Sequence, residues 1–370
     1  MRIPSFLSLL AFRRGAWPLA VLTVVCLNSC SSGGSQTATL PLPVGHYEGS
    51  ISYQGTDRRV ALDLREASPG KLEADLHFPE EAGSSFAAAN VRYKEPQLQF
   101  EQQGSGSNMS VTAIREGDFL RGVFTLDSLK AEFVWARRGQ AAPRAYQAQA
   151  FAVRAAGRTE RLTVFVPADT AVRHSAVVLL AAGPAAAPAL ARADMLARQG
   201  ILTVLVPFAQ PPADADSAAL QRVAAILQAL RKEPSVDSMQ VGLWLRGAGA
   251  GALVAAAGLA QPAATFVLLE NVPATTAAAT KPFQQLSRQR IPVLAYYAAA
   301  DTSLNARESA RRLRSAVGAR RGSLVRVFPQ ATADFIVPGR LTAEGKWTWP
   351  QPAPEFTEGV AGWLRQRRAR

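Results

Sequence analysis

Cysteine and histidine are scarce in this chain. Its 370 residues include two cysteines, Cys26 and Cys30, and both lie near the N-terminus. The rest of the chain therefore offers no disulfide framework, no cysteine metal site and no cysteine nucleophile. It has three histidines and none follows His174, so the later part of the chain has no imidazole to serve as a general base.

The chain also lacks a nucleic-acid motif and a basic groove interleaved with aromatic residues. Its formal net charge is +13, but the basic residues are scattered apart from short clusters such as 311–314 and 365–370. Scattered basic residues are typical of solvated helix faces, and we expect no nucleic-acid partner. The length and the 48% hydrophobic content allow two domains with sizeable cores.

The N-terminal segment has the pattern of an export signal. Two arginines precede an apolar run that is too short for a transmembrane helix, and small residues follow it. The run Leu27-Asn28-Ser29-Cys30 resembles the lipobox of bacterial lipoproteins. We expect residues 1–29 to be a signal peptide and Cys30 to be lipidated. The rest of 30–43, rich in Ser, Gly, Thr and Pro, would be a flexible tether.

These features predict an exported lipoprotein, anchored in the bacterial cell envelope at the outer membrane. Several acyl chains on one cysteine would anchor the protein firmly, because each buried methylene contributes about 0.8 kcal/mol. The alternative is an ordinary signal peptide with an incidental cysteine.

Residues 44–139 show short segments with a two-residue period. Val60, Leu62 and Leu64, for example, would share one face of a strand. About eight antiparallel strands are expected, which favours a small barrel or sandwich. Such a barrel could carry a small apolar ligand, but an interior filled by its own side chains is the favoured alternative. His46 and His77 lie here, with no partner at metal-ligand spacing.

Residues 148–370 alternate between apolar strands and helical segments. Val177–Leu180 is a continuous apolar run, as in strands buried on both faces, and 216–232 forms an amphipathic helix pattern. Strand–helix alternation predicts a mostly parallel sheet with helices on both faces. The predicted fold class is therefore α/β, preceded by a small antiparallel barrel-like domain.

The predicted strand Met239–Leu245 leads into a turn that reads Leu245-Arg246-Gly247-Ala248-Gly249, and an Ala-rich helix follows. Strand, glycine-dense turn and helix make up the nucleophile elbow, in which G-x-S-x-G exposes a serine hydroxyl. Here the glycines are present and the serine is not. Three further segments, besides the elbow, carry the resemblance described next. They are 297–301, 328–335 and 347–350.

On these segments the chain resembles the α/β-hydrolase family, and within it exported bacterial esterases and acyl hydrolases that carry an N-terminal β domain. The resemblance implies that Gly247 stands at the nucleophile position, Asp301 at the acid position and Ala333 at the base position. It also implies an oxyanion loop at 181–186, where alanines replace the usual polar residues. His174 should lie at the opposite edge of the sheet. The catalytic motif is thus degenerate, and Asp301 could simply shape a turn.

The same edge of the predicted sheet carries further polar residues that could support other chemistry. Glu270, Asn271, Asp301 and Asp334 could form a cluster for a metal ion or for acid–base work, but no spacing motif supports it. Arg246 could hold an anion near the helix start, or it could pair with Glu270 or Asp301. We expect no metal and no cofactor.

The sequence therefore predicts a catalytically inactive envelope lipoprotein that binds an unknown small molecule or envelope protein and contacts the membrane through lipidated Cys30. One alternative is a carboxylic ester or acyl hydrolase with non-standard catalytic residues. Another is a small apolar ligand carrier that uses the β domain.

Overall fold

The computed structural model describes residues 41–81, 84–102, 104, 108–155, 157–182, 186–210, 216–318 and 322–368. The expected signal peptide and lipidated Cys30 lie outside these residues. Residues Leu42–Arg370 form one compact unit. None of the helices in the described ranges is long and apolar enough to cross a membrane.

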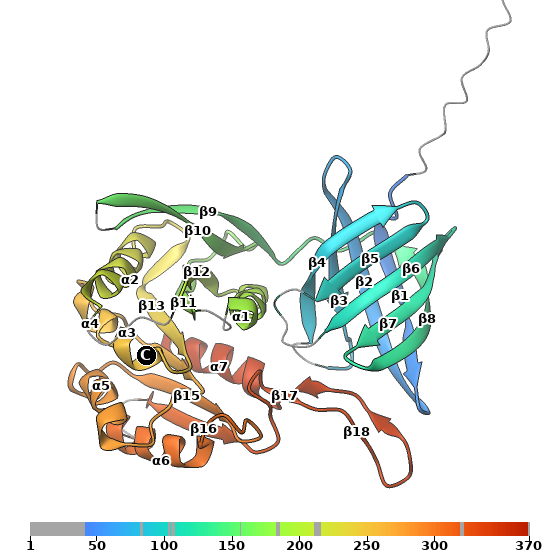
Figure 1. The fold of residues 1–370 in the computed structure, drawn as a ribbon. Helices are drawn as coiled ribbons and strands as arrows, with labels where there is room; N and C mark the ends of the chain where they lie inside the picture. The colour runs from blue at the N-terminus through green and yellow to red at the C-terminus, as the bar shows by residue number, and fades with distance from the viewer. Residues whose placement is uncertain are drawn as a thin grey trace, which may run out of the picture. The chain divides into compact units, whose positions relative to one another are not determined.

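The first part of this unit is a closed barrel in which each strand pairs antiparallel with the next and β1 also pairs with β8 (Figure 1). Its strands are β1 (Gly45–Tyr53), β2 (Thr56–Ser68), β3 (Lys71–His77), β4 (Ser85–Lys94), β5 (Gln97–Gln102), β6 (Met109–Glu116), β7 (Phe119–Leu126) and β8 (Leu129–Gly139). Of the two architectures that the sequence left open, the chain adopts the barrel.

The barrel interior is packed by side chains of this chain. Alternate residues such as Leu62 and Leu64 join Phe124 in one buried cluster, as the two-residue strand period requires. A segment far along the sequence completes this cluster: Trp349 packs against Phe124 with ring centroids 6.4 Å apart, and Trp347 packs edge-on against Tyr53 at 5.5 Å. This packing favours a filled interior over a ligand-carrying one.

The second part is an eight-stranded sheet with the order β16-β15-β14-β13-β11-β12-β10-β9. The strands β11 to β16 are parallel, while β10 is antiparallel to β12 and β9 to β10. Their bounds are β9 (Tyr146–Ala155), β10 (Arg158–Pro167), β11 (His174–Ala182), β12 (Leu202–Phe208), β13 (Val236–Arg246), β14 (Val267–Glu270), β15 (Val293–Ala298) and β16 (Leu324–Phe328).

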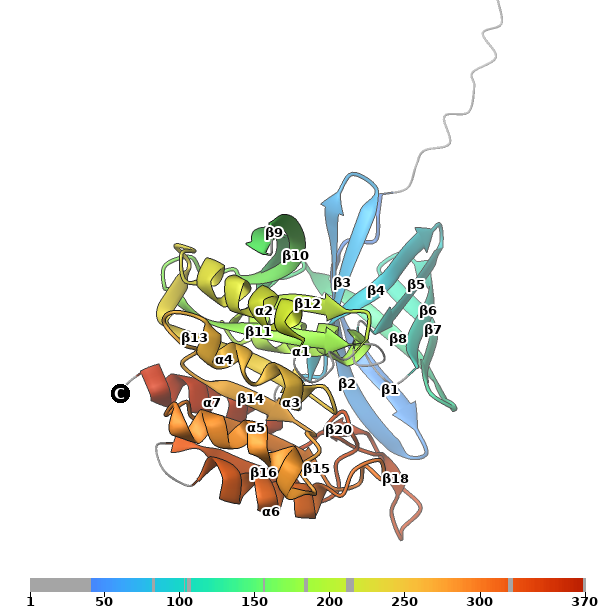
Figure 2. The same cartoon turned by 60° about the vertical axis from the view of Figure 1, so that its left-hand side comes forward.

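Helices cover both faces of this sheet (Figures 1 and 2). One face packs against α2 (Ser217–Leu230), α3 (Ala250–Leu253), α4 (Ala256–Leu259), α5 (Ala277–Arg288) and α6 (Ala306–Val317). The other packs against α1 (Ala186–Arg198) and α7 (Phe356–Arg368). Two short strand pairs precede α7: β17 (Ile336–Val337) with β20 (Gln351–Pro352), and β18 (Arg340–Leu341) with β19 (Trp347–Thr348).

The predicted fold class is confirmed: an α/β-hydrolase-like, mostly parallel sheet follows a closed antiparallel barrel. The boundaries 44–139 and 148–370 stay predictions as domain limits, because Leu42–Arg370 forms one unit.

A buried ion cluster joins the barrel to α1. Asp75 of β3 has no exposed surface and accepts hydrogen bonds from Arg65 (2.5 Å), Arg144 (3.2 Å) and Arg198 of α1 (2.5 Å). Arg198 also binds Asp194, which accepts a 2.6 Å hydrogen bond from Tyr146. Burial alone would raise the pKa of Asp75, but the three guanidinium groups lower it to about 2.

Replacing Asp75 with Asn should destabilise the protein by about 3–5 kcal/mol, because three buried or half-buried arginines lose their shared carboxylate. Urea unfolding followed by circular dichroism would measure this. The pKa of Asp75 lies below its ordinary value of 3.8. The stabilisation is therefore complete above that value and is lost as the pH falls towards 2.

The difference in free energy of unfolding between wild type and Asp75→Asn should therefore be smaller when urea unfolding is repeated at about pH 2. Glu308→Gln, which removes a partly exposed carboxylate paired with Arg311 and Arg312 on the surface of α6, is the control and should change the urea midpoint little. An Asp75→Asn protein as stable as wild type at neutral pH would contradict this account.

Candidate functional site

The elbow is a sharp corner between β13 and α3. Gly247 has a φ of +68°, a region that favours glycine. Its N–H donates to the Glu270 carbonyl (3.0 Å), and its own carbonyl accepts from the Ala250 N–H (3.3 Å). Among the described residues, which leave out 183–185, a Cβ built on Gly247 would meet no atom within 4 Å beyond its chain neighbours. Within that part of the chain, the corner has open space where the expected nucleophile's side chain would stand, but Gly247 has no side chain.

The loop that carries the expected base position lies against the elbow. Arg246 donates to the Ala333 carbonyl (3.1 Å) and to the Asp334 carboxylate (2.7 Å). Asn271, at the end of β14, also donates to the Ala333 carbonyl (2.9 Å). The structure thus brings Gly247 and Ala333 to the same corner of the fold, and both lack a functional side chain.

Glu270 is the centre of the charges at this corner. It is 1% exposed and accepts hydrogen bonds from Arg192 of α1 at both carboxylate oxygens (3.2 and 3.1 Å). The Trp244 indole N–H donates to it at 3.0 Å, and Arg246 Nη1 lies 3.4 Å from it. Arg192 in turn donates to the Asp334 carbonyl (2.9 Å). Two arginines and two carboxylates therefore form one network, named here the Glu270 network: Arg192, Arg246, Glu270 and Asp334.

The positive charge of Arg246 is paired with the two carboxylates of the Glu270 network. Burial acts to lower the pKa of Arg246, but Glu270 and Asp334 raise it by more, so the guanidinium stays charged. Anion binding at Arg246 stays a prediction, and an incoming anion would have to displace one of the two carboxylates.

Asp301 lies in the loop after β15 and shapes a turn. Its carboxylate accepts from the Ser303 N–H (2.9 Å) and hydroxyl (2.6 Å), just ahead of Asn305, which caps α6. Asp301, which is expected at the acid position, thus has a local structural partner, and its role as an acid stays a prediction.

His174 lies at the start of β11, at the amino ends of the parallel strands, whereas the elbow lies at their carboxyl ends. Its ring nitrogens are 2.9 Å from the Gly200 carbonyl and 2.6 Å from the Asp169 carbonyl. The expected oxyanion loop at 181–186 falls largely on 183–185, outside the described residues.

The carboxylates considered for metal binding do not gather into one site. Arginines separate Glu270 from Asp334, and Asp301 is turned to Ser303. Within the described ranges, no three His, Cys, Asp or Glu side chains are grouped so that they could hold a metal ion.

The barrel contains a cluster that sequence reasoning did not assemble. Asp63 binds His46 Nδ1 (2.8 Å) and His77 Nε2 (3.0 Å), and His77 Nδ1 lies 2.9 Å from the Ser85 hydroxyl. Burial lowers the pKa of His77. If Nε2–H donates to Asp63, Nδ1 is left to accept from Ser85. The strand register was the available signal, since His46 pairs with Asp63 and His77 with Ser85 across neighbouring strands.

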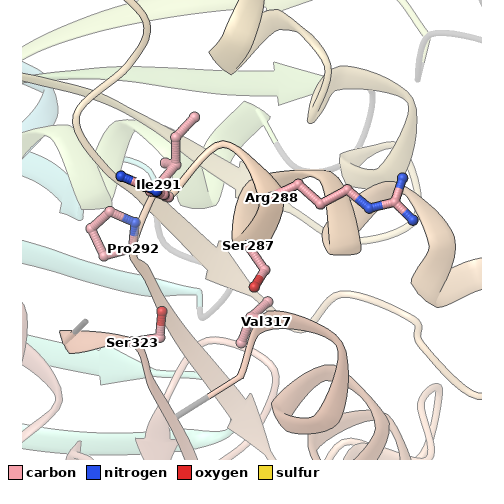
Figure 3. Close-up of a pocket in the computed structure, with 7 residues that line it drawn as sticks. Ser287, Arg288, Ile291, Pro292, Val317 and Ser323 are labelled. Atoms are coloured by element: carbon pink, nitrogen blue, oxygen red, sulfur yellow. The ribbon is translucent and has the colours of Figure 1, made fainter. Parts of the chain in front are cut away.

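A pocket of about 210 Å³ lies elsewhere (Figure 3). It is lined by the last turns of α5 and α6 and by residues just before β15 and β16, including Ser287, Ile291, Val317 and Ser323. The pocket is therefore at the amino ends of the strands and does not belong to the elbow.

In comparisons of sequence, no family model and no curated protein matches the chain. Similar solved structures include esterases from Rhizomucor miehei (16% identity, 60% of this chain and 84% of the other, TM-score 0.43). An esterase from Pyrobaculum calidifontis is 14% identical (60% and 87%, 0.41). A thermostable esterase from Pseudomonas putida ECU1011 is 19% identical (50% and 72%, 0.35). Likenesses this distant do not bear on the activity of the chain.

Gly247→Ala should cost about 1–2 kcal/mol, because the new Cβ has space but the left-handed backbone disfavours it. Gly242→Ala in β13 is the comparison: there a Cβ would lie 2.4 Å from the Phe266 ring and 2.6 Å from its carbonyl oxygen. That substitution should cost about 3 kcal/mol or more. Urea unfolding of both variants measures the difference, and equal costs would contradict the open corner.

Glu270→Gln should destabilise the protein by about 3–5 kcal/mol, because Arg192 and Arg246 lose their common buried carboxylate. Glu116→Gln removes an exposed partner of Arg121 and should cost less than about 1 kcal/mol. If urea unfolding shows equal effects for the two, the Glu270 network does not stabilise the elbow.

Proposed function

We propose that this chain is a non-catalytic protein of α/β-hydrolase fold, anchored in the bacterial envelope through lipidated Cys30, that works by binding a small molecule or an envelope protein. The observation that carries the proposal is the Glu270 network, which occupies the corner where Gly247 and Ala333 replace the nucleophile and the base.

The requirements of acyl transfer explain why the Glu270 network supports a non-catalytic role. A serine mechanism needs a nucleophile, a base within hydrogen-bond reach and a group that orients the base. Gly247 has no side chain, and the nearby Asp334 is bound to Arg246 at 2.7 Å. Both carboxylates of the Glu270 network are paired with arginines. This arrangement suits a structural role for the corner better than a catalytic one.

The anchoring part of the proposal is supported by the run Leu27–Cys30 and the polar segment that follows it. An acylated Cys30 in the membrane would hold the protein at the envelope, together with any molecule that the protein binds. No metal or cofactor is required for such a role.

A second candidate function is ester hydrolysis at Ser85, which the hydrogen-bonded order Ser85–His77–Asp63 favours. In this reading His77 Nδ1 would take the Ser85 proton as the hydroxyl attacks an ester carbonyl. The leaving alcohol would receive that proton, and water would then release the acid from Ser85. Ser85 lies on a strand rather than on a strand-to-helix turn, which ranks this candidate second.

Turnover of p-nitrophenyl acetate and butyrate tests the proposal. Wild type and Ser85→Ala should both hydrolyse these esters no faster than a buffer blank without protein, because neither has a functional nucleophile. Activity in wild type that disappears in Ser85→Ala would replace the proposal with the second candidate. Activity that survives Ser85→Ala would overturn both.

A further inference from the structure

Four large apolar side chains are exposed on one side of the barrel. Ile114 is 49% exposed, Phe119 49%, Val123 37% and Val134 43%. Single exposed apolar residues are ordinary on protein surfaces, whereas a contiguous group marks a site of interaction.

The strand register shows that these four are contiguous. Ile114 of β6 pairs with Arg121 of β7, and Arg121 pairs with Val134 of β8. Phe119 and Val123 are the residues two before and two after Arg121, so they point to the same side of the sheet. Directly paired side chains lie about 4.5–5.5 Å apart at their Cβ atoms. Ile114, Phe119, Val123 and Val134 therefore surround Arg121, and we name these five residues the Arg121 face.

Arg121 is the basic residue of the face, and two acidic residues border it, because Phe119 pairs with Glu116 and Val123 pairs with Glu132. The Arg121 side chain is 62% exposed, and its ion pair with Glu116 (3.3 Å) is exposed on both sides. Such pairs are weak and are readily exchanged for another anion. A long cationic side chain among apolar ones can keep its charged end in a polar layer while its methylenes stay in apolar surroundings.

The position of the face in the chain indicates what covers it. Phe119 pairs with Ala136, which pairs with Glu48 of β1, and β1 begins at Gly45. The Phe119 end of the face thus lies at the barrel end where the chain arrives from the tether. The 12 residue steps from Cys30 to Leu42 span at most about 43 Å when fully extended. A bilayer that held Cys30 would therefore lie within reach of the face.

Size argues against a stable protein partner on this face alone. Stable protein interfaces use about 20–30 residues on each side, and the face offers five. A lipid surface needs no matching partner shape, and apolar side chains beside a basic one suit its headgroup boundary.

We propose that the Arg121 face rests on the lipid bilayer, with Phe119 and Ile114 at the boundary between headgroups and acyl chains and Arg121 at lipid phosphate. The orientation follows from the proposed lipid anchor at Cys30. The barrel then lies with the Arg121 face on the membrane surface.

The test uses residues 31–370, which hold the whole compact unit and contain no cysteine. An N-terminal histidine tag on nickel-chelating lipid replaces the acyl anchor, in vesicles of phosphatidylethanolamine and phosphatidylglycerol. An NBD fluorophore is attached to Val123→Cys on the face. The control is Leu341→Cys. Leu341 lies in β18, is 54% exposed and is not part of the Arg121 face.

On anchoring, NBD emission at position 123 should rise by about twofold or more and should be quenched by brominated acyl chains, as an apolar environment requires. NBD at position 341 should not respond. Adding Ile114→Ser and Phe119→Ser to the Val123→Cys protein should abolish the rise. No response at 123, or equal responses at 123 and 341, would overturn the proposal.

A rise at 123 that depends on protein concentration and needs no vesicles would assign the face to a second copy of the chain, and it would also overturn the membrane assignment. The anchor is tested separately, by mass spectrometry of the Cys30 peptide from the membrane fraction of cells. An unmodified Cys30 would overturn the proposed anchor without changing the vesicle result.

Discussion

The structure around the elbow depends on one buried carboxylate, Glu270. Taking a carboxylate out of water costs several kcal/mol unless charged partners and hydrogen bonds replace the water. Arg192 of α1 and Trp244 and Arg246 of β13 supply those partners. The contacts that satisfy Glu270 therefore hold α1, β13 and the loop at Asp334 in fixed positions relative to one another.

Helix α1 links this corner to the barrel. Arg192 binds Glu270, while Asp194 and Arg198, two and six residues further along α1, bind groups of the barrel. Asp75 is the barrel's counterpart of Glu270, since it is also fully buried and held by arginines. Trp349 adds an apolar connection from the last part of the chain to the barrel core. Helix α1 thus carries one arginine partner of each buried carboxylate: Arg192 for Glu270 and Arg198 for Asp75.

Local patterns were enough to predict the elements. The two-residue period of β2 indicated a barrel strand, the run Val177–Leu180 indicated a buried parallel strand, and the glycines around Gly247 indicated the corner. Long-range pairing was not predictable in the same way. Arg192 and Arg198 look like residues of a solvated helix face in the sequence, and Asp75 looks like an ordinary outward-facing strand residue.

Their partners are 78 and 123 positions away, and only the packing of α1 against both parts brings them together. The pairing of His46 and His77 with Asp63 required the exact strand register, which turn residues alone do not fix.

We propose that the chain does not carry out acyl transfer, although it keeps an elbow-like corner at Gly247. A fluorophosphonate probe tests this most directly, because it reacts covalently with activated serines, and peptide mapping then identifies the labelled position. The account predicts that no serine of the purified wild-type protein is labelled. Stoichiometric labelling of a serine, at Ser85 or anywhere else, would contradict it.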